Sequence, residues 1–89
     1  MEIAPEATHD VISRLRRVEG QIGGIVRMLE EHRDCTDVVT QLAAAGHALH
    51  RAGFKLLASG MRQCMVDGPD GARGDMTIEA MEKLFLSLA

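Results

Sequence analysis

The chain has 89 residues, of which 46% are hydrophobic and only 2% are aromatic, with no tryptophan and no tyrosine. A chain of this length forms one small domain, and such domains usually need a metal, a cross-link or assembly for stability. Aliphatic residues, alanine and methionine favour a helical core over a sheet. The net charge of −3 does not exclude nucleic acid, because residues 11–66 hold eight basic and five acidic residues.

The first predicted element is a helix over about residues 7–31. Its apolar residues recur every three or four positions, which is typical of an amphipathic helix. They are Val11, Leu15, Val18, Ile22, Ile25 and Leu29. At about 100° per residue, Arg14 and Arg17 flank this apolar stripe and Arg16 lies opposite it. The segment EEHRD then ends the helix, and Asp34 is suited to cap the next one.

The second predicted helix covers about residues 35–66, followed by a loop over about 67–75 and a third helix over about 76–88. The stripe of the second helix consists of Val38, Leu42, Ala45, Leu49, Ala52 and Leu56. The third is marked by Ile78, Met81, Leu84, Phe85 and Leu88. A helix of some 30 residues is over about 45 Å long, and the first helix is too short to cover it. The sequence therefore predicts an all-α domain over residues 1–89 that assembles with other copies.

The two cysteines, Cys35 and Cys64, are 29 residues apart on the second predicted helix. This separation places both on one helical face but about 43 Å apart, whereas a disulfide needs Cα atoms within about 7 Å. Two copies of the helix packed antiparallel, crossing near residues 49 and 50, would bring Cys35 of one chain beside Cys64 of the other. The alternative is that both are small buried apolar residues, as free cysteines often are.

Few other residues in the chain are arranged for chemistry. The histidines show no tight metal-ligand spacing with the cysteines; they are His9, His32, His47 and His50. The sequence contains no phosphate-binding loop, dinucleotide fingerprint or catalytic triad, so we do not expect an enzyme. It also has no apolar span of about 20 residues, and we expect a cytoplasmic protein with no membrane partner.

The segment RLRRVEGQIGGIVRMLEEHRDCTDVVTQLAAAGHALHRAGFKLLASGMRQC closely resembles the CsoR/RcnR family of bacterial transcriptional repressors. The resemblance extends over nearly the whole chain. It implies an antiparallel four-helix-bundle dimer, a tetramer built as a dimer of dimers, and operator DNA as partner. Arg14 and Arg51 match the family's DNA-contacting basic positions, with Arg16, Arg17 and Lys55 as further candidates.

The branches of this family differ at the positions that sense the inducer. Copper sensors carry a Cys–His–Cys set whose His precedes the second Cys by one helical turn. Here Cys35 and Cys64 match the two Cys positions and Gly60 occupies the His position. A Cys pair without His resembles the CstR-type branch, in which persulfide or polysulfide links thiols of opposite subunits and the repressor leaves its operator.

Three functions remain open at this point. We favour a repressor with no resident cofactor that senses reactive sulfur species through Cys35 and Cys64, with Gly60 and Met61 in the sensing pocket. The alternative is a repressor that binds Cu(I) through the same thiolates, because Cu(I) is a soft ion. Its third ligand would then be Met61 or a nearby His. A thiol-based enzyme is the least favoured function.

Overall fold

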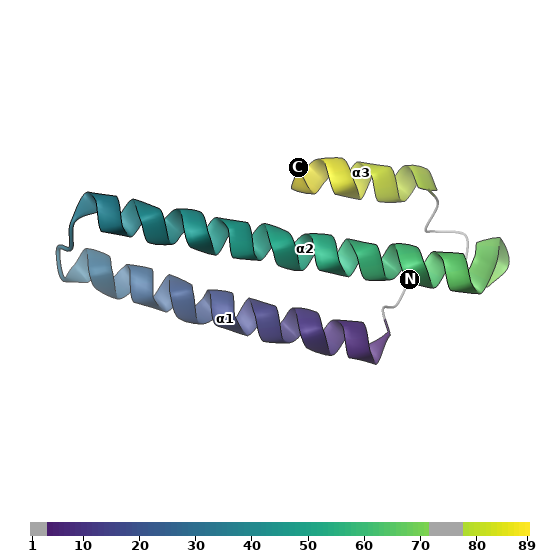
Figure 1. Ribbon diagram of the computed structural model, residues 1–89, viewed down its shortest axis with the longest axis horizontal. Helices are drawn as coiled ribbons and strands as arrows, with labels where there is room; N and C mark the ends of the chain where they lie inside the picture. The colour runs from purple at the N-terminus through teal and green to yellow at the C-terminus, as the bar shows by residue number, and fades with distance from the viewer. Residues whose placement is uncertain (1–3, 72–77) are drawn as a thin grey trace.

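The computed structural model describes residues 4–71 and 78–89. Three helices follow one another along the chain: α1 (Pro5–Glu30), α2 (Cys35–Gly71) and α3 (Ile78–Leu88). α1 and α2 form an antiparallel hairpin, and α3 returns along the C-terminal half of α2 (Figure 1). The protomer is a thin plate with extents of 55 × 24 × 14 Å. The predicted all-α, three-helix fold is confirmed.

The start of α1 is attached to the C-terminal half of α2. Pro5 begins the helix, where its missing N–H costs no intrahelical bond. Ala4 offers no side chain to cap the helix, but its backbone N–H donates to Oε1 of Gln63 at 3.1 Å. This hydrogen bond joins residues 59 positions apart in sequence, at the open end of the hairpin.

The turn between α1 and α2 is short and well bonded. His32 adopts a left-handed conformation with φ of 55°, and the N–H of Arg33 donates to the carbonyl oxygen of Met28 at 2.9 Å. These are features of a helix C-cap in which a left-handed residue ends the helix. Oδ2 of Asp34 then accepts the N–H of Thr36 at 3.1 Å, which confirms Asp34 as the cap of α2.

The core of the hairpin consists of one apolar row from each helix. Every seventh residue is buried, so each row runs along one side of its helix over successive pairs of turns. The buried rows are Val11, Val18 and Ile25 in α1, and Val38, Ala45 and Ala52 in α2. Ile25, Val38 and Ala45 form one cluster. The predicted stripes therefore divide, since only half of each stripe lies in this core.

The other half of each stripe remains exposed. Every one of these residues lies four positions after a buried one, about 40° further around its helix. Antiparallel helices turn in opposite senses along a common axis, so both exposed rows lie on the same side of the hairpin. Their side chains are 38% to 57% exposed: Leu15, Ile22, Leu29, Leu42, Leu49 and Leu56. We call this the leucine side.

α3 packs antiparallel on α2 through a glycine and an aromatic pair. A Cβ placed on Gly53 would lie 2.8 Å from Cδ2 of Leu88, so the missing side chain lets α3 approach closely. Beside this contact, the rings of Phe54 and Phe85 are tilted at 60°, with centroids 5.4 Å apart. α3 therefore has a fixed register on α2.

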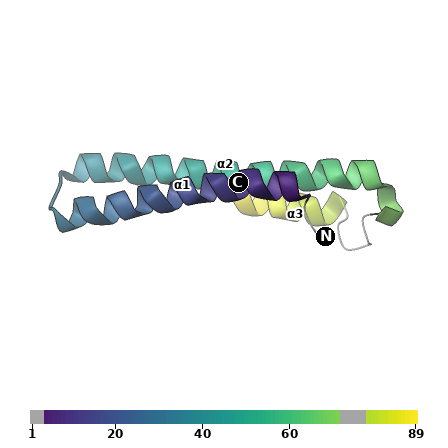
Figure 2. The ribbon, with the colours of Figure 1, turned by 90° about the horizontal axis from the view of Figure 1, so that it is seen from below.

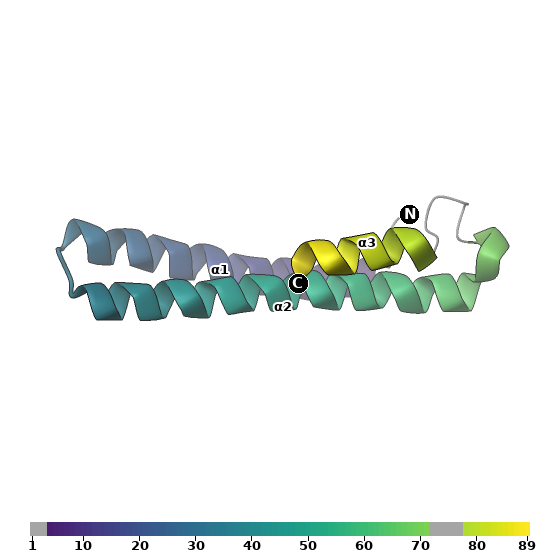
Figure 3. The same cartoon turned by 90° about the horizontal axis from the view of Figure 1, so that it is seen from above.

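The helix boundaries depart from the prediction mainly at the end of α2. α2 continues to Gly71 instead of ending near residue 66, so residues 67–71 of the predicted loop are helical. Residues 72–75 of that loop, and the predicted start of α3 at 76–77, lie outside the described residues. A proline lacks the N–H for the regular bond, so a helix continuing through position 69 has to bend. Figures 2 and 3 show the last turn of α2 turned away from the helix axis.

Among the described residues, no helix is both long enough and apolar enough to cross a membrane.

The left-handed turn residue predicts a stabilising substitution. His32→Gly should raise the free energy of unfolding by about 1 kcal/mol, because a Cβ disfavours the left-handed region. His9→Gly is the matched control: His9 is exposed within α1, so a glycine there should destabilise by roughly 0.5 kcal/mol. Urea denaturation at one protein concentration measures both. A destabilising His32→Gly would contradict the assignment of this turn.

Candidate functional site

Three of the five predicted basic residues surround a single cavity. Arg14 and Arg17 of α1 and Arg51 of α2 line a space of about 190 Å³, together with Gln21 and Ala48. Each of these residues lies three positions after, or one position before, a residue of the buried rows. Such positions face away from the leucine side in both helices. The hairpin thus separates an apolar side from a basic side.

The arginines of this cavity differ in their partners. Nε of Arg14 donates to Oδ2 of Asp10, one turn earlier in α1, at 3.2 Å. The Asp10 side chain is 54% exposed, and such surface pairs are weak, so Arg14 can exchange this partner for another anion. Arg17 and Arg51 are exposed, and no carboxylate among the described residues pairs with them. The cavity therefore presents positive charge to solvent.

Arg16 and Lys55 lie outside this cavity. Arg16 is exposed two positions before the buried Val18, which places it on the far side of α1 from α2. Lys55 is exposed one turn after Arg51 and lies on the same side of α2. The structure therefore extends the basic side to Lys55 but not to Arg16.

The two cysteines lie at opposite ends of α2. Cys35 is its first residue and is exposed in the protomer. Cys64 lies in the C-terminal third of the helix, and its side chain is outside the described residues. A separation of 29 residues along one helix is about 43 Å, so the pair does not meet within one protomer. In the described part of the chain, no three His, Cys, Asp or Glu groups are placed to hold a metal ion.

The structure separates the two residues predicted to line the sensing pocket. Gly60 is buried within the protomer, whereas Met61 is 47% exposed. The sequence did not indicate that Gly60 would be covered. The reason is that a helix from a distant part of the chain, α3, lies over this part of α2 (Figure 1).

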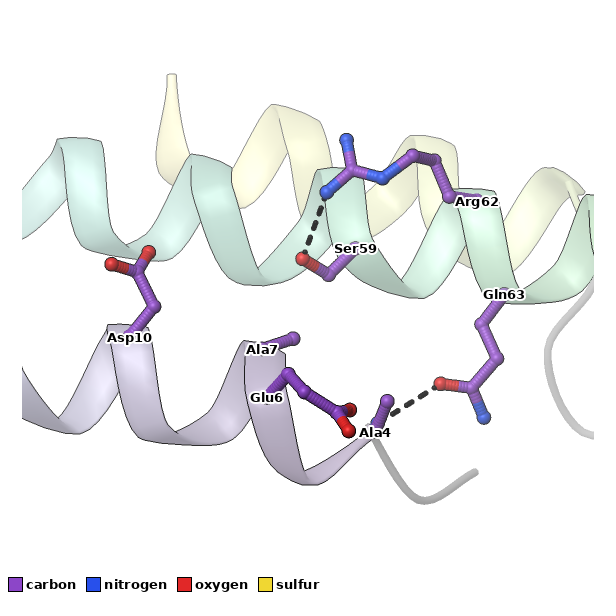
Figure 4. A pocket seen from close by; sticks show the side chains of 7 residues that line it. All are labelled: Ala4, Glu6, Ala7, Asp10, Ser59, Arg62 and Gln63. Carbon is purple, nitrogen blue, oxygen red and sulfur yellow. Dashed lines mark hydrogen bonds between the residues drawn. The ribbon is translucent and has the colours of Figure 1, made fainter.

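A second cavity lies between the start of α1 and the C-terminal half of α2 (Figure 4). It is open, has a volume of about 760 Å³, and was not anticipated from the sequence, because its two walls are far apart along the chain. Nη2 of Arg62 donates to Oγ of Ser59 at 3.2 Å across one wall. The lining residues are Ala4, Glu6, Ala7, Asp10, Ser59, Arg62 and Gln63.

Comparison with known proteins identifies the family. A family profile described as metal-sensitive transcriptional repressor matches residues 7–87. The chain belongs to this family. It is 43% identical over 67 residues to the copper-sensing transcriptional repressor RicR of Mycobacterium tuberculosis, covering 71% of this chain and 70% of that protein. It is 31% identical over 75 residues to the copper-sensing transcriptional repressor CsoR of Bacillus subtilis, covering 84% and 74%.

The chain is also 34% identical over 70 residues to the copper-sensing transcriptional repressor CsoR of Mycobacterium tuberculosis, covering 79% of this chain and 59% of that protein. The CsoR/RcnR resemblance is thus confirmed, and the chain is a transcriptional repressor, not an enzyme. These relatives are named for copper, which favours the Cu(I) alternative over the persulfide interpretation preferred from the sequence.

Proposed function

We propose that this repressor binds operator DNA through its basic side and releases it when Cu(I) binds thiolates of two subunits. The convergence of Arg14, Arg17 and Arg51 on one cavity supports the DNA surface. The copper-sensing relatives support the inducer. Each part of this proposal depends on a different surface of the hairpin.

The leucine side supports assembly with a second copy. Six large aliphatic side chains in two continuous rows are exposed there, and apolar patches of this kind mark interfaces. A second hairpin has the same rows, so two copies related by a twofold axis would bury both. If the two α2 helices cross antiparallel near Leu49, Cys35 of each chain approaches the end of the partner's helix that carries Cys64. Two such dimers would form the tetramer that the family resemblance implies.

If the leucine side is used for assembly, the basic side of the hairpin remains available for operator binding. Guanidinium groups bind phosphate oxygens in a bidentate manner, and phosphate contacts make affinity strongly dependent on salt. Among the described residues, no carboxylate forms an ion pair with Arg17 or Arg51, and the pair between Arg14 and Asp10 is exposed. A DNA backbone can therefore approach all three arginines without displacing a buried ion pair. Lys55 extends the same surface along α2.

The donor set fits Cu(I) better than a harder metal. Thiolates are soft ligands that select Cu(I) over magnesium, calcium or manganese ions. Cys35 and Cys64 are 29 residues apart along α2, about 43 Å, so the two thiolates at one metal site would come from two subunits. Cys35 is exposed and accessible to a partner, and Cys64 would supply the second thiolate. Bound Cu(I) would supply a bridge between subunits.

Persulfide sensing remains the second candidate because of Gly60. Copper sensors of this family would carry His there, and a glycine supplies no ligand. In this chemistry the Cys35 thiolate attacks the sulfane sulfur of a persulfide, which forms a Cys35 persulfide and releases a thiolate. The partner's Cys64 thiolate then attacks the sulfur of Cys35 itself, forming a disulfide and expelling hydrosulfide.

A charge on the leucine side should prevent assembly. Leu49→Glu places a carboxylate at the centre of the proposed interface, where its burial is costly, so the variant should form smaller species than the wild type. Ala43→Glu adds the same charge at an exposed position on the outer side of α2 and should leave assembly unchanged. Light scattering after gel filtration measures the mass. A wild-type mass in Leu49→Glu would refute this interface.

Removal of one arginine should weaken operator binding in a salt-dependent way. Arg51→Ala should lower affinity, and the slope of log affinity against log salt should fall by about one for each phosphate that the arginine neutralises. Arg33→Ala removes the same charge at the turn between α1 and α2, away from the cavity, and should bind almost as the wild type does. Fluorescence anisotropy across a salt series measures both. Equally weakened binding in the two variants would show that net charge, not this surface, is responsible.

The two inducers can be separated on one reduced sample. With Cu(I) we expect release of operator DNA and an unchanged covalent mass after the metal is removed. A persulfide donor should leave the complex bound. Anisotropy and intact mass spectrometry measure these outcomes, and Cys35→Ser should stay on DNA in both arms. Release by persulfide with a covalent dimer, and no response to Cu(I), would replace the first candidate by the second.

A further inference from the structure

The register of α3 places a methionine opposite Gly60. Leu88 lies against Gly53, and the ring of Phe85 packs on Phe54. Met81 lies seven residues before Leu88, and Gly60 lies seven residues after Gly53. Both helices run antiparallel (Figure 1) and rise about 1.5 Å per residue, so this register brings the two positions level with each other along the helix axes.

Burial agrees with this register. Met81 is 6% exposed, and it is the one buried residue among positions 79–88 of α3. Gly60 is buried as well, and Leu57, one turn earlier in α2, is 8% exposed. A glycine at position 60 has no side chain of its own to occupy space on this face of α2. Met61, by contrast, is 47% exposed and lies on another side of α2.

The chemistry of a thioether suits this place. Methionine sulfur is a soft donor that binds Cu(I), and it needs no deprotonation to do so. Position 60 precedes position 64 by four residues, about 6 Å along the axis of α2. Measured along this axis, a donor level with Gly60 is therefore offset from the backbone position of Cys64 by about one helical turn. No other described residue of α3 brings sulfur to this part of α2.

We propose that Met81 is a Cu(I) ligand, which supplies from α3 the third donor that Gly60 cannot supply from α2. This proposal rests on the proposed copper-sensing function. It also gives α3 a role in sensing, because a ligand on α3 and a ligand on α2 join the two helices when the metal binds. Met61, which the sequence offered as a third ligand alongside a nearby His, would not contribute.

The test uses the full-length reduced repressor grown with selenomethionine and loaded with one Cu(I) per subunit. X-ray absorption at the copper edge should show scattering from selenium in the labelled protein and none in the unlabelled protein. The signal should persist in Met61→Leu and disappear in Met81→Leu. Competition with a chromogenic Cu(I) chelator should show at least about a tenfold drop in affinity in Met81→Leu alone.

Leucine has nearly the volume of methionine and no donor atom, so a purely structural role would be preserved in this variant. Its operator affinity without copper and its circular dichroism should match the wild type. Labelled wild type that binds Cu(I) without a selenium signal would refute Met81 as ligand, whether or not the variant folds. So would a signal that persists in Met81→Leu. A wild type that binds no Cu(I) would instead refute the copper function itself.

Discussion

An apolar residue at every third or fourth position gives each long helix two apolar rows, and one partner helix can cover only one of them. In this hairpin the row with the smaller residues of α2, such as Ala45 and Ala52, is buried against α1. The row with the larger residues, such as Leu42 and Leu49, is left outside. The hydrophobic effect therefore accounts for the burial of one row within the chain, and it would favour burial of the other row in the proposed dimer. The polar positions, including those of the basic side, are confined to the helix surface that the two apolar rows do not occupy.

Much of the protomer could be predicted from local sequence signals. Periodicity indicated all three helices, and the N-cap at Asp34 has the expected hydrogen bond to Thr36. The end of α2 was predicted wrongly, because glycine and proline after residue 66 are typical of loops but do not by themselves forbid one more turn. The division of each stripe into two rows was not predicted either. It depends on which side of one helix meets the other, and both rows satisfy the same periodicity.

Only part of the candidate site could be predicted, again because periodicity does not show how the helices pack on one another. Helical angles alone placed Arg14 and Arg17 beside the apolar stripe, and the structure adds Arg51 to them across the hairpin. Gly60 stood out as a missing ligand, but the sequence around it contains no sign of Met81. Their juxtaposition is set by a contact elsewhere, between Gly53 and Leu88, that only the packed helices reveal. Contacts of this kind depend on how the surfaces of distant segments fit together, and they produce no periodic pattern in the sequence.

The protomer is only 14 Å thick along its shortest dimension. Such a plate has a single layer of helices, and the same two helices form its leucine side and its basic side. A rotation of α1 or α2 that adjusts one side must therefore turn the other by the same angle, with no intervening core to absorb it. A ligand or partner that rotated either helix from the leucine side would therefore also change the spacing of the arginines on the basic side. In a protomer this thin, the leucine side and the basic side are therefore mechanically linked through the same two helices.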